Sequence, residues 1–242
     1  MTLDVGRAVG RTFRFYARLF GVLFPVALLI NAILSFAFSG VEIEQNDLSQ
    51  LFMIVILAVV VSMMGASLVT AVSIFAVEDI QDGERDLSFG DLISSGVTVI
   101  GPVIAVSLLA AVGVAVGIIA LVIPGLLALT WWAAVVPSVV IERTGVFGAF
   151  TRSVKLVSGK AWSVFGYGLI MVVVLLVANL VLDKVVGPIV VDLIGPLAAD
   201  VVLGSVTTPF VAVGYAVLYF ELRRIEVGAA ILDDPWTGGT PR

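Results

Sequence analysis

The chain has 242 residues, of which 60% are hydrophobic and 13% charged, and its formal net charge is -5. Soluble domains carry about 25% charged residues, and a water-soluble core of this size could not bury so much apolar surface. Cysteine and histidine are both absent, which excludes disulfides, thiolate nucleophiles and the commonest general base, metal ligand and pH switch. The composition therefore predicts an integral membrane protein, and we expect no enzymatic activity, no cofactor and no metal site.

The chain begins with a basic amphipathic segment that leads into the first span. Over residues 3–18, arginines recur every three or four positions, opposite an apolar helix face: Arg7, Arg11, Arg14 and Arg18. Such a helix lies in the membrane interface as an anchor, or it binds an anionic lipid head group or a partner. Residues 19–38 carry no charge and are long enough to cross about 30 Å of hydrocarbon, which predicts the first transmembrane helix.

Three further spans are predicted over residues 51–77, 97–121 and 126–141. Acidic segments at 41–50 and 78–96 are interpreted as solvated loops, because the second lacks the ligand order of a calcium loop.

The long uncharged stretch from residue 97 to 141 needs an internal turn. Pro124-Gly125 is the stretch best equipped to form it. Gly113 and Gly117 predict a face for close helix contact, and Pro137 predicts a kink or break. Trp131 and Trp132 are interpreted as structural residues, in an aromatic belt or between helices, rather than as a ligand-stacking pair.

A second basic amphipathic helix is predicted between residues 142 and 160, with an apolar stripe opposite Arg152 and Lys155. Span 161–182 follows, and two Gly-Pro pairs, Gly187-Pro188 and Gly195-Pro196, predict an outer loop. The last span covers residues 201–220 with a kink expected at Pro209. Residues 1–228 are interpreted as one membrane domain and residues 229–242 as a flexible tail.

Six spans place both termini on the same side of the membrane. Lys184 is then the one basic residue on the opposite side, and by the positive-inside rule the termini are cytoplasmic. Similar start signals before the first, third and fifth spans predict three degenerate repeats, each a short interfacial amphipathic helix followed by a two-helix hairpin. The twelve basic residues on the terminal side are Arg7, Arg11, Arg14, Arg18, Arg85, Arg143, Arg152, Lys155, Lys160, Arg223, Arg224 and Arg242.

Several motifs resemble a known membrane family. They are Ile123-Pro124-Gly125, the span ending at Glu142, the spacing of Ala149, Ser153, Leu156 and Gly159, and the closing Tyr219-Phe220-Glu221-Leu222-Arg223. Together they are similar to the glycerophosphoryl diester phosphodiesterase membrane domain family and its stand-alone prokaryotic relatives. The resemblance implies a six-helix module without an activity of its own, and the chain has neither room for a catalytic barrel nor the histidines of such an enzyme.

Two functions remain open from the sequence. A scaffold or interaction module linked to lipid or envelope maintenance in the cytoplasmic membrane requires only packed helices and basic interfacial segments. A transporter or lipid-handling permease is the alternative, and a water-filled cavity at mid-depth would favour it. Membrane lipids are the expected partners, another membrane or peripheral protein is an alternative, and nucleic acid is not expected. The candidate docking residues are Arg7, Arg11, Arg14, Arg18, Arg152, Lys155, Lys160, Arg223 and Arg224, and Pro124 and Gly125 are the candidate structural turn.

Overall fold

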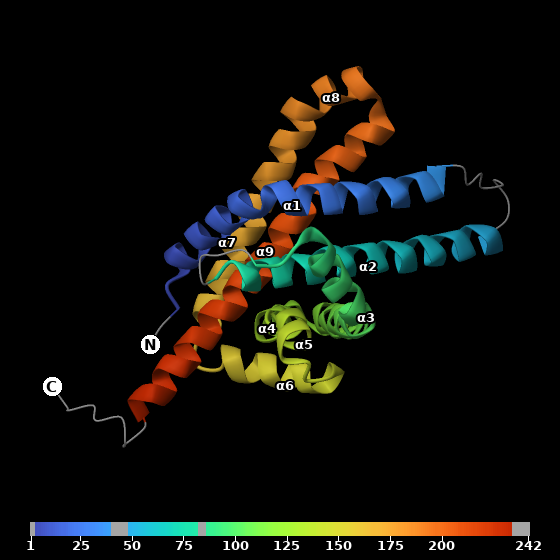
Figure 1. The fold of residues 1–242 in the computed structure, drawn as a ribbon. Helices are drawn as coiled ribbons and strands as arrows, with labels where there is room; N and C mark the ends of the chain where they lie inside the picture. Colours follow the sequence, from blue (N-terminus) through green and yellow to red (C-terminus); the bar gives the residue numbers. More distant parts are fainter. Residues whose placement is uncertain (1–2, 40–47, 82–85, 234–242) are drawn as a thin grey trace.

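The computed structural model describes residues 3–39, 48–81 and 86–233, and regular secondary structure in this part of the chain is entirely helical (Figure 1). Residues 41–47 of the predicted acidic segment at 41–50, Arg85, and residues 234–242 of the predicted tail at 229–242 lie outside the described residues. The all-helical fold and the six apolar spans agree with the sequence prediction. The helices long and apolar enough to cross a membrane cover Val5–Phe36, Val61–Asp79, Phe89–Ala120, Val122–Glu142, Ala161–Ile194 and Pro196–Gly228.

The first two basic or polar start segments do not form separate helices. Helix α1 runs from Val5 to Ser39 without a break, so the arginine-rich segment and the first span are one helix. Asp4 caps it by accepting a hydrogen bond from the Arg7 N–H at 2.9 Å. Helix α2 covers Leu48–Asp79 and helix α3 covers Phe89–Ala120, with Ser88 and Asp91 forming a capping box. No stop signal separates the polar start of α1 or α3 from its apolar part, which explains the continuity.

The turn between the third and fourth spans lies earlier than predicted. Leu121 is extended (φ −165°, ψ 138°), and helix α4 begins directly after it and covers Val122–Trp131. Pro124 and Gly125 therefore lie in the first turn of α4, where the missing N–H of proline costs no intrahelical hydrogen bond. A Cβ atom on Gly125 would lie 2.2 Å from Ile118 Cγ1, so this glycine lets α3 and α4 approach each other.

The predicted contact face of Gly113 and Gly117 is confirmed. A Cβ atom on Gly113 would lie 2.5 Å from the Trp132 ring, and one on Gly117 would lie 2.9 Å from the Gly125 Cα. Helix α5, Val135–Glu142, begins after a break at residues 132–134. Pro137 explains the break, because it has no N–H to donate to the carbonyl four residues earlier.

The basic segment between the fourth and fifth spans forms a separate helix. Helix α6 covers Val146–Val157, and Gly159 ends the segment with a φ of 74° that favours glycine. Helix α7 covers Ala161–Val181.

The predicted outer loop after the fifth span is wrong, because the chain stays helical. A π-helical turn at Leu182–Val186 leads into helix α8, Gly187–Ile194. The Gly187 N–H donates to the Leu182 carbonyl, and this wider turn accommodates Pro188 inside a helical run. The reversal occurs at Gly195, whose φ is 84°.

The last helix is longer than predicted at both ends. Helix α9 runs from Pro196 through Pro209 to Asp233, so it includes the first five residues of the expected tail.

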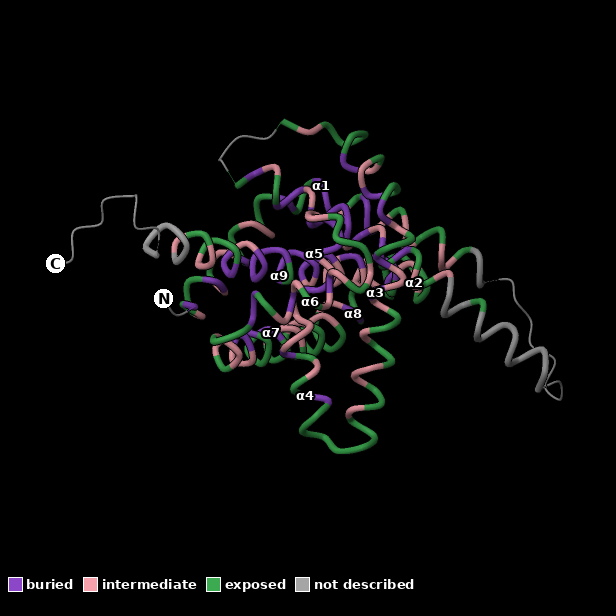
Figure 2. The backbone as a smooth tube through the Cα atoms, turned by 90° about the horizontal axis from the view of Figure 1, so that it is seen from below, coloured by how far each residue is buried: buried purple, intermediate pink, exposed green. Residues whose placement is uncertain are grey.

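Among the described residues, the buried core is concentrated at one end of the bundle, although Ala199 and Val201 near the start of α9 are also buried. This terminal end, where α1 begins and α9 ends, holds the start of α3 and of α7 and all of α6. The buried residues of α3 all precede Ser107, and those of α7 all precede Val172. At the far end the helices separate: α8 and the end of α1 point apart in Figure 1, and the exposed α3–α4 turn extends in a third direction in Figure 2.

Candidate functional site

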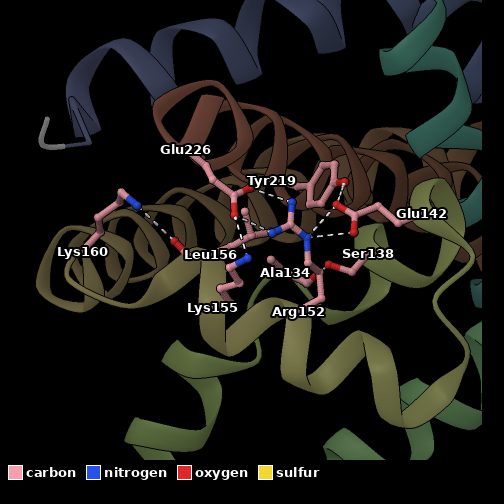
Figure 3. A network of polar contacts seen from close by, with 9 residues as sticks. All are labelled: Ala134, Ser138, Glu142, Arg152, Lys155, Leu156, Lys160, Tyr219 and Glu226. Carbon is pink, nitrogen blue, oxygen red and sulfur yellow. Dashed lines mark hydrogen bonds and ion pairs between the residues drawn. The ribbon is translucent and has the colours of Figure 1, made fainter. Parts of the chain in front are cut away.

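Arg152 is the centre of a polar network at the terminal end (Figure 3). Its Nε donates to both carboxylate oxygens of Glu142 at 2.7 and 2.8 Å, and its Nη1 and Nη2 each donate to Glu226 at 2.7 Å. The Tyr219 hydroxyl donates to Glu142 at 2.6 Å. The hydrogen bonds to Glu226 raise the pKa of Arg152, partly offset by burial. One guanidinium thereby joins α5, α6 and α9.

Ser153, the next residue on α6, docks the helix onto the break between α4 and α5. Its hydroxyl donates to the Trp131 carbonyl at 2.8 Å and accepts from the Ala134 N–H at 3.1 Å. These are the backbone groups that an interrupted helix leaves without intrahelical partners. Ala149 and Leu156 lie on the same buried face of α6.

A second polar group joins α1 to α9. The buried carboxylate of Glu221, 4% exposed, pairs with Arg11 of α1 and with Arg224 at 2.8 Å. Next to this carboxylate, the hydroxyl oxygens of Thr12 and Tyr167 are hydrogen-bonded to each other at 2.9 Å. The Tyr167 hydroxyl also lies 2.9 Å from the Gly214 carbonyl oxygen. Glu221 is therefore a buried carboxylate that two arginines neutralise.

The structure divides the predicted docking residues into two sets. Arg11 and Arg152 are engaged inside the chain, Arg224 pairs with Glu221, and Lys160 donates to the Leu156 carbonyl at 3.4 Å. The exposed set at the terminal end comprises Arg7, Arg14, Arg18, Lys155, Arg223 and also Arg224. Within it, Arg7 pairs with Asp4 at 3.4 Å and Lys155 lies 3.8 Å from Glu226.

Sequence reasoning missed the acidic partners of these bases, which are Glu142, Glu221 and Glu226. Glu142 and Glu221 each follow an apolar run, and all three lie within one helical turn of an arginine, which was the available signal.

A cavity of about 590 Å³, here called the central cavity, lies between α2, α3, α4, α5, α7 and α9. Thr70, in its wall, lies about 14 Å along α2 from Asp79, which is about half the helix length needed to cross a hydrocarbon layer of about 30 Å. None of the described residues that line it is charged. Its polar side chains are Thr70, Ser107, Trp132, Asn179, Thr207, Thr208 and Tyr215.

Three polar groups of the central cavity have no hydrogen-bond partner among the described residues. They are the hydroxyls of Ser107 and Tyr215 and the indole N–H of Trp132. In contrast, Thr70 and Thr208 donate to carbonyls of their own helices at 2.8 and 2.9 Å. Unpaired polar groups within a membrane are costly, so this cavity suits an occupant with oxygen atoms.

Two further cavities share walls with the central cavity. An apolar groove of about 330 Å³ lies between α4, α7 and α9 and shares Leu129, Ala133, Leu175, Val211 and Tyr215 with it. A cavity of about 650 Å³ between α1, α2 and α9 shares Ala66 and Thr208. Tyr215 is 42% exposed although it lies in a span, so the system is open at the side of the bundle.

These features define the class of protein. Six helices that are long and apolar enough to cross a membrane are compatible with a multi-pass helical membrane protein. The chain matches no family model, no curated protein and no solved structure.

Proposed function

We propose that the protein is a lipid-handling permease, which takes a lipid from the bilayer into the space between its spans. The central cavity is the observation that carries this proposal. It lies at mid-depth, it is lined by unpaired hydroxyl groups, and it adjoins an apolar groove. Its volume is in the range of ligand sites. A tightly packed bundle would have supported the scaffold function instead.

The membrane arrangement forms part of the proposal. Three hairpins, α1–α2, α3–α4 and α7–α9, cross the cytoplasmic membrane, and the basic start segments and α6 lie at its inner surface. The twelve basic residues on the terminal side support cytoplasmic termini. The exposed bases Arg7, Arg14 and Lys155 then meet anionic lipid head groups.

Kinship with the glycerophosphoryl diester phosphodiesterase membrane domain family remains part of the proposal, without enzymatic activity. This part of the proposal rests on the sequence motifs alone, and four of their residues, Ala149, Ser153, Leu156 and Tyr219, are buried.

A scaffold or interaction module is the second candidate. The observation in its favour is the Arg152 network, which fixes α6 against α5 and α9 and so presents Lys155, 74% exposed, on a rigid surface. A protein partner would dock there.

The test is lipid retention by matched variants. Gly168 lines the apolar groove and Gly166 does not, and a Cβ atom on either would meet nothing within 4 Å. Gly168→Phe therefore fills the groove, whereas Gly166→Phe adds the same ring elsewhere. Each protein is extracted in native-membrane nanodiscs, and its lipids and proteins are quantified by mass spectrometry.

We expect the wild type and Gly166→Phe to retain one lipid near stoichiometrically and Gly168→Phe to lose it. Equal lipid content in all three proteins would refute the permease. A stoichiometric protein partner that is lost in Lys155→Glu, with no retained lipid, would establish the scaffold.

A further inference from the structure

We infer that the occupant of the central cavity is an amphiphile with an uncharged, oxygen-containing head, such as a diacylglycerol or a long-chain alcohol. This inference rests on the proposed lipid-handling function and specifies its ligand. The head lies in the central cavity, and the hydrocarbon chain lies in the apolar groove.

The chemistry of the cavity wall selects the head group. Ser107 and Tyr215 each offer a hydroxyl, which donates and accepts, and Trp132 offers an indole N–H, which only donates. Their common partner is a hydroxyl or ester oxygen. A phosphate at this site would be buried without a counter-charge, because none of the described lining residues is charged.

The position of Tyr215 joins the two halves of the site. It belongs to the walls of both the central cavity and the apolar groove, so one side chain borders both the polar and the apolar compartment. The remaining groove wall is formed by side chains such as Leu126, Met171 and Leu218, which favour a hydrocarbon chain. An amphiphile places its polar head in the central cavity and its hydrocarbon chain in the apolar groove. Water alone would leave the apolar side chains of the groove exposed to a polar solvent, which is unfavourable.

The arginines of the terminal end do not supply a counter-charge for an anionic head group in the central cavity. Arg152 and Arg11, the two that are held inside the chain, pair with Glu142, Glu226 and Glu221 at the terminal end. Their charge is already neutralised by carboxylates. A lipid phosphate therefore has its favourable place at the exposed bases of the terminal end, outside the central cavity.

The experiment compares two photoactivatable lipids with identical diazirine-bearing chains in nanodiscs that contain the full-length protein. One is a diacylglycerol and the other a phosphatidylglycerol. Cross-linked peptides are mapped by mass spectrometry to the groove walls of α4, α7 and α9. The variants are Tyr215→Phe, which removes the unpaired hydroxyl, and Tyr16→Phe, a matched control whose hydroxyl donates to the Val206 carbonyl at 2.6 Å outside the cavity wall.

We expect diacylglycerol to label the groove peptides at least tenfold more than phosphatidylglycerol. Tyr215→Phe should reduce diacylglycerol labelling by about fivefold to tenfold, the effect of one hydrogen bond, while Tyr16→Phe leaves it unchanged. Equal labelling by both lipids, or an unchanged Tyr215→Phe, would overturn the uncharged-head assignment but leave lipid handling intact. Absence of groove labelling by either lipid would overturn both.

Discussion

Replacement of Arg152 by alanine should be among the most destabilising changes in the terminal-end core. The guanidinium makes four charge-assisted contacts to Glu142 and Glu226, and its side chain is 18% exposed. Truncating one partner of a buried ion pair costs about 3–5 kcal/mol, because the remaining charges lose their partner. The side chains of Glu142 and Glu226 are 20% and 31% exposed, so water can hydrate their carboxylates and offset part of the free-energy cost. We expect a decrease of about 2–3 kcal/mol in the free energy of unfolding.

The assay is equilibrium unfolding by SDS in dodecyl maltoside micelles, followed by tryptophan fluorescence. Trp132 packs edge-on against Phe150 of α6, with ring centroids 5.1 Å apart, so the signal reports on the contact that Arg152 holds.

Two further variants provide the controls. Lys155→Ala removes a 74% exposed amine 3.8 Å from Glu226 and should cost less than about 0.5 kcal/mol. Arg152→Lys keeps the charge but cannot bridge both carboxylates. Its loss of unfolding free energy should lie between those of Arg152→Ala and Lys155→Ala. If the free energies of unfolding of Arg152→Ala and Lys155→Ala differ by less than about 0.5 kcal/mol, the Arg152 network does not hold α6 in place and the reasoning fails.

Three other predictions concern packing, a buried hydroxyl and topology. Gly125→Ala should destabilise by about 1–3 kcal/mol, because the new Cβ would lie 2.7 Å from a backbone nitrogen of α3. Gly101→Ala, where space is open, should be neutral or slightly stabilising in the same unfolding assay. Tyr167→Phe loses its polar contacts with α1 and α9 and should cost about 1–2 kcal/mol, and an unchanged midpoint would contradict their role. In the cysteine-free chain, a membrane-impermeant maleimide added to intact cells should label Lys184→Cys but not Lys155→Cys, and the reverse result would invert the proposed orientation.

The sequence predicted the number and approximate place of the spans because bilayer thickness imposes a length that uncharged runs reveal directly. It did not predict the turns reliably. Pro124-Gly125 and Gly187-Pro188 carry the same residues as the true reversal at Gly195-Pro196, yet both lie inside helical runs. Proline is as compatible with the first turn of a helix as with a loop, so local preference alone cannot separate the two.

The candidate site shows a different limit of sequence reasoning. The sequence drew attention to the basic residues but not to their acidic partners, because Arg152 and Glu226 are 74 positions apart and Arg11 and Glu221 are 210 apart. The central cavity depends on the angles at which six helices cross, and no periodicity in one helix encodes that quantity. The sequence therefore could not show that the hydroxyl groups of Ser107 and Tyr215 belong to the wall of the same cavity.

The concentration of the described core at the terminal end gives the protein two mechanically different halves. At the terminal end, ion pairs and buried side chains set the distances between helices. In the proposed membrane arrangement, acyl chains surround the separated helices of the far end, so the lateral pressure of the bilayer acts on these helices more than on the terminal end. A change in bilayer thickness or acyl-chain order therefore alters the distances between helices at the far end, while the distances between helices at the terminal end stay the same.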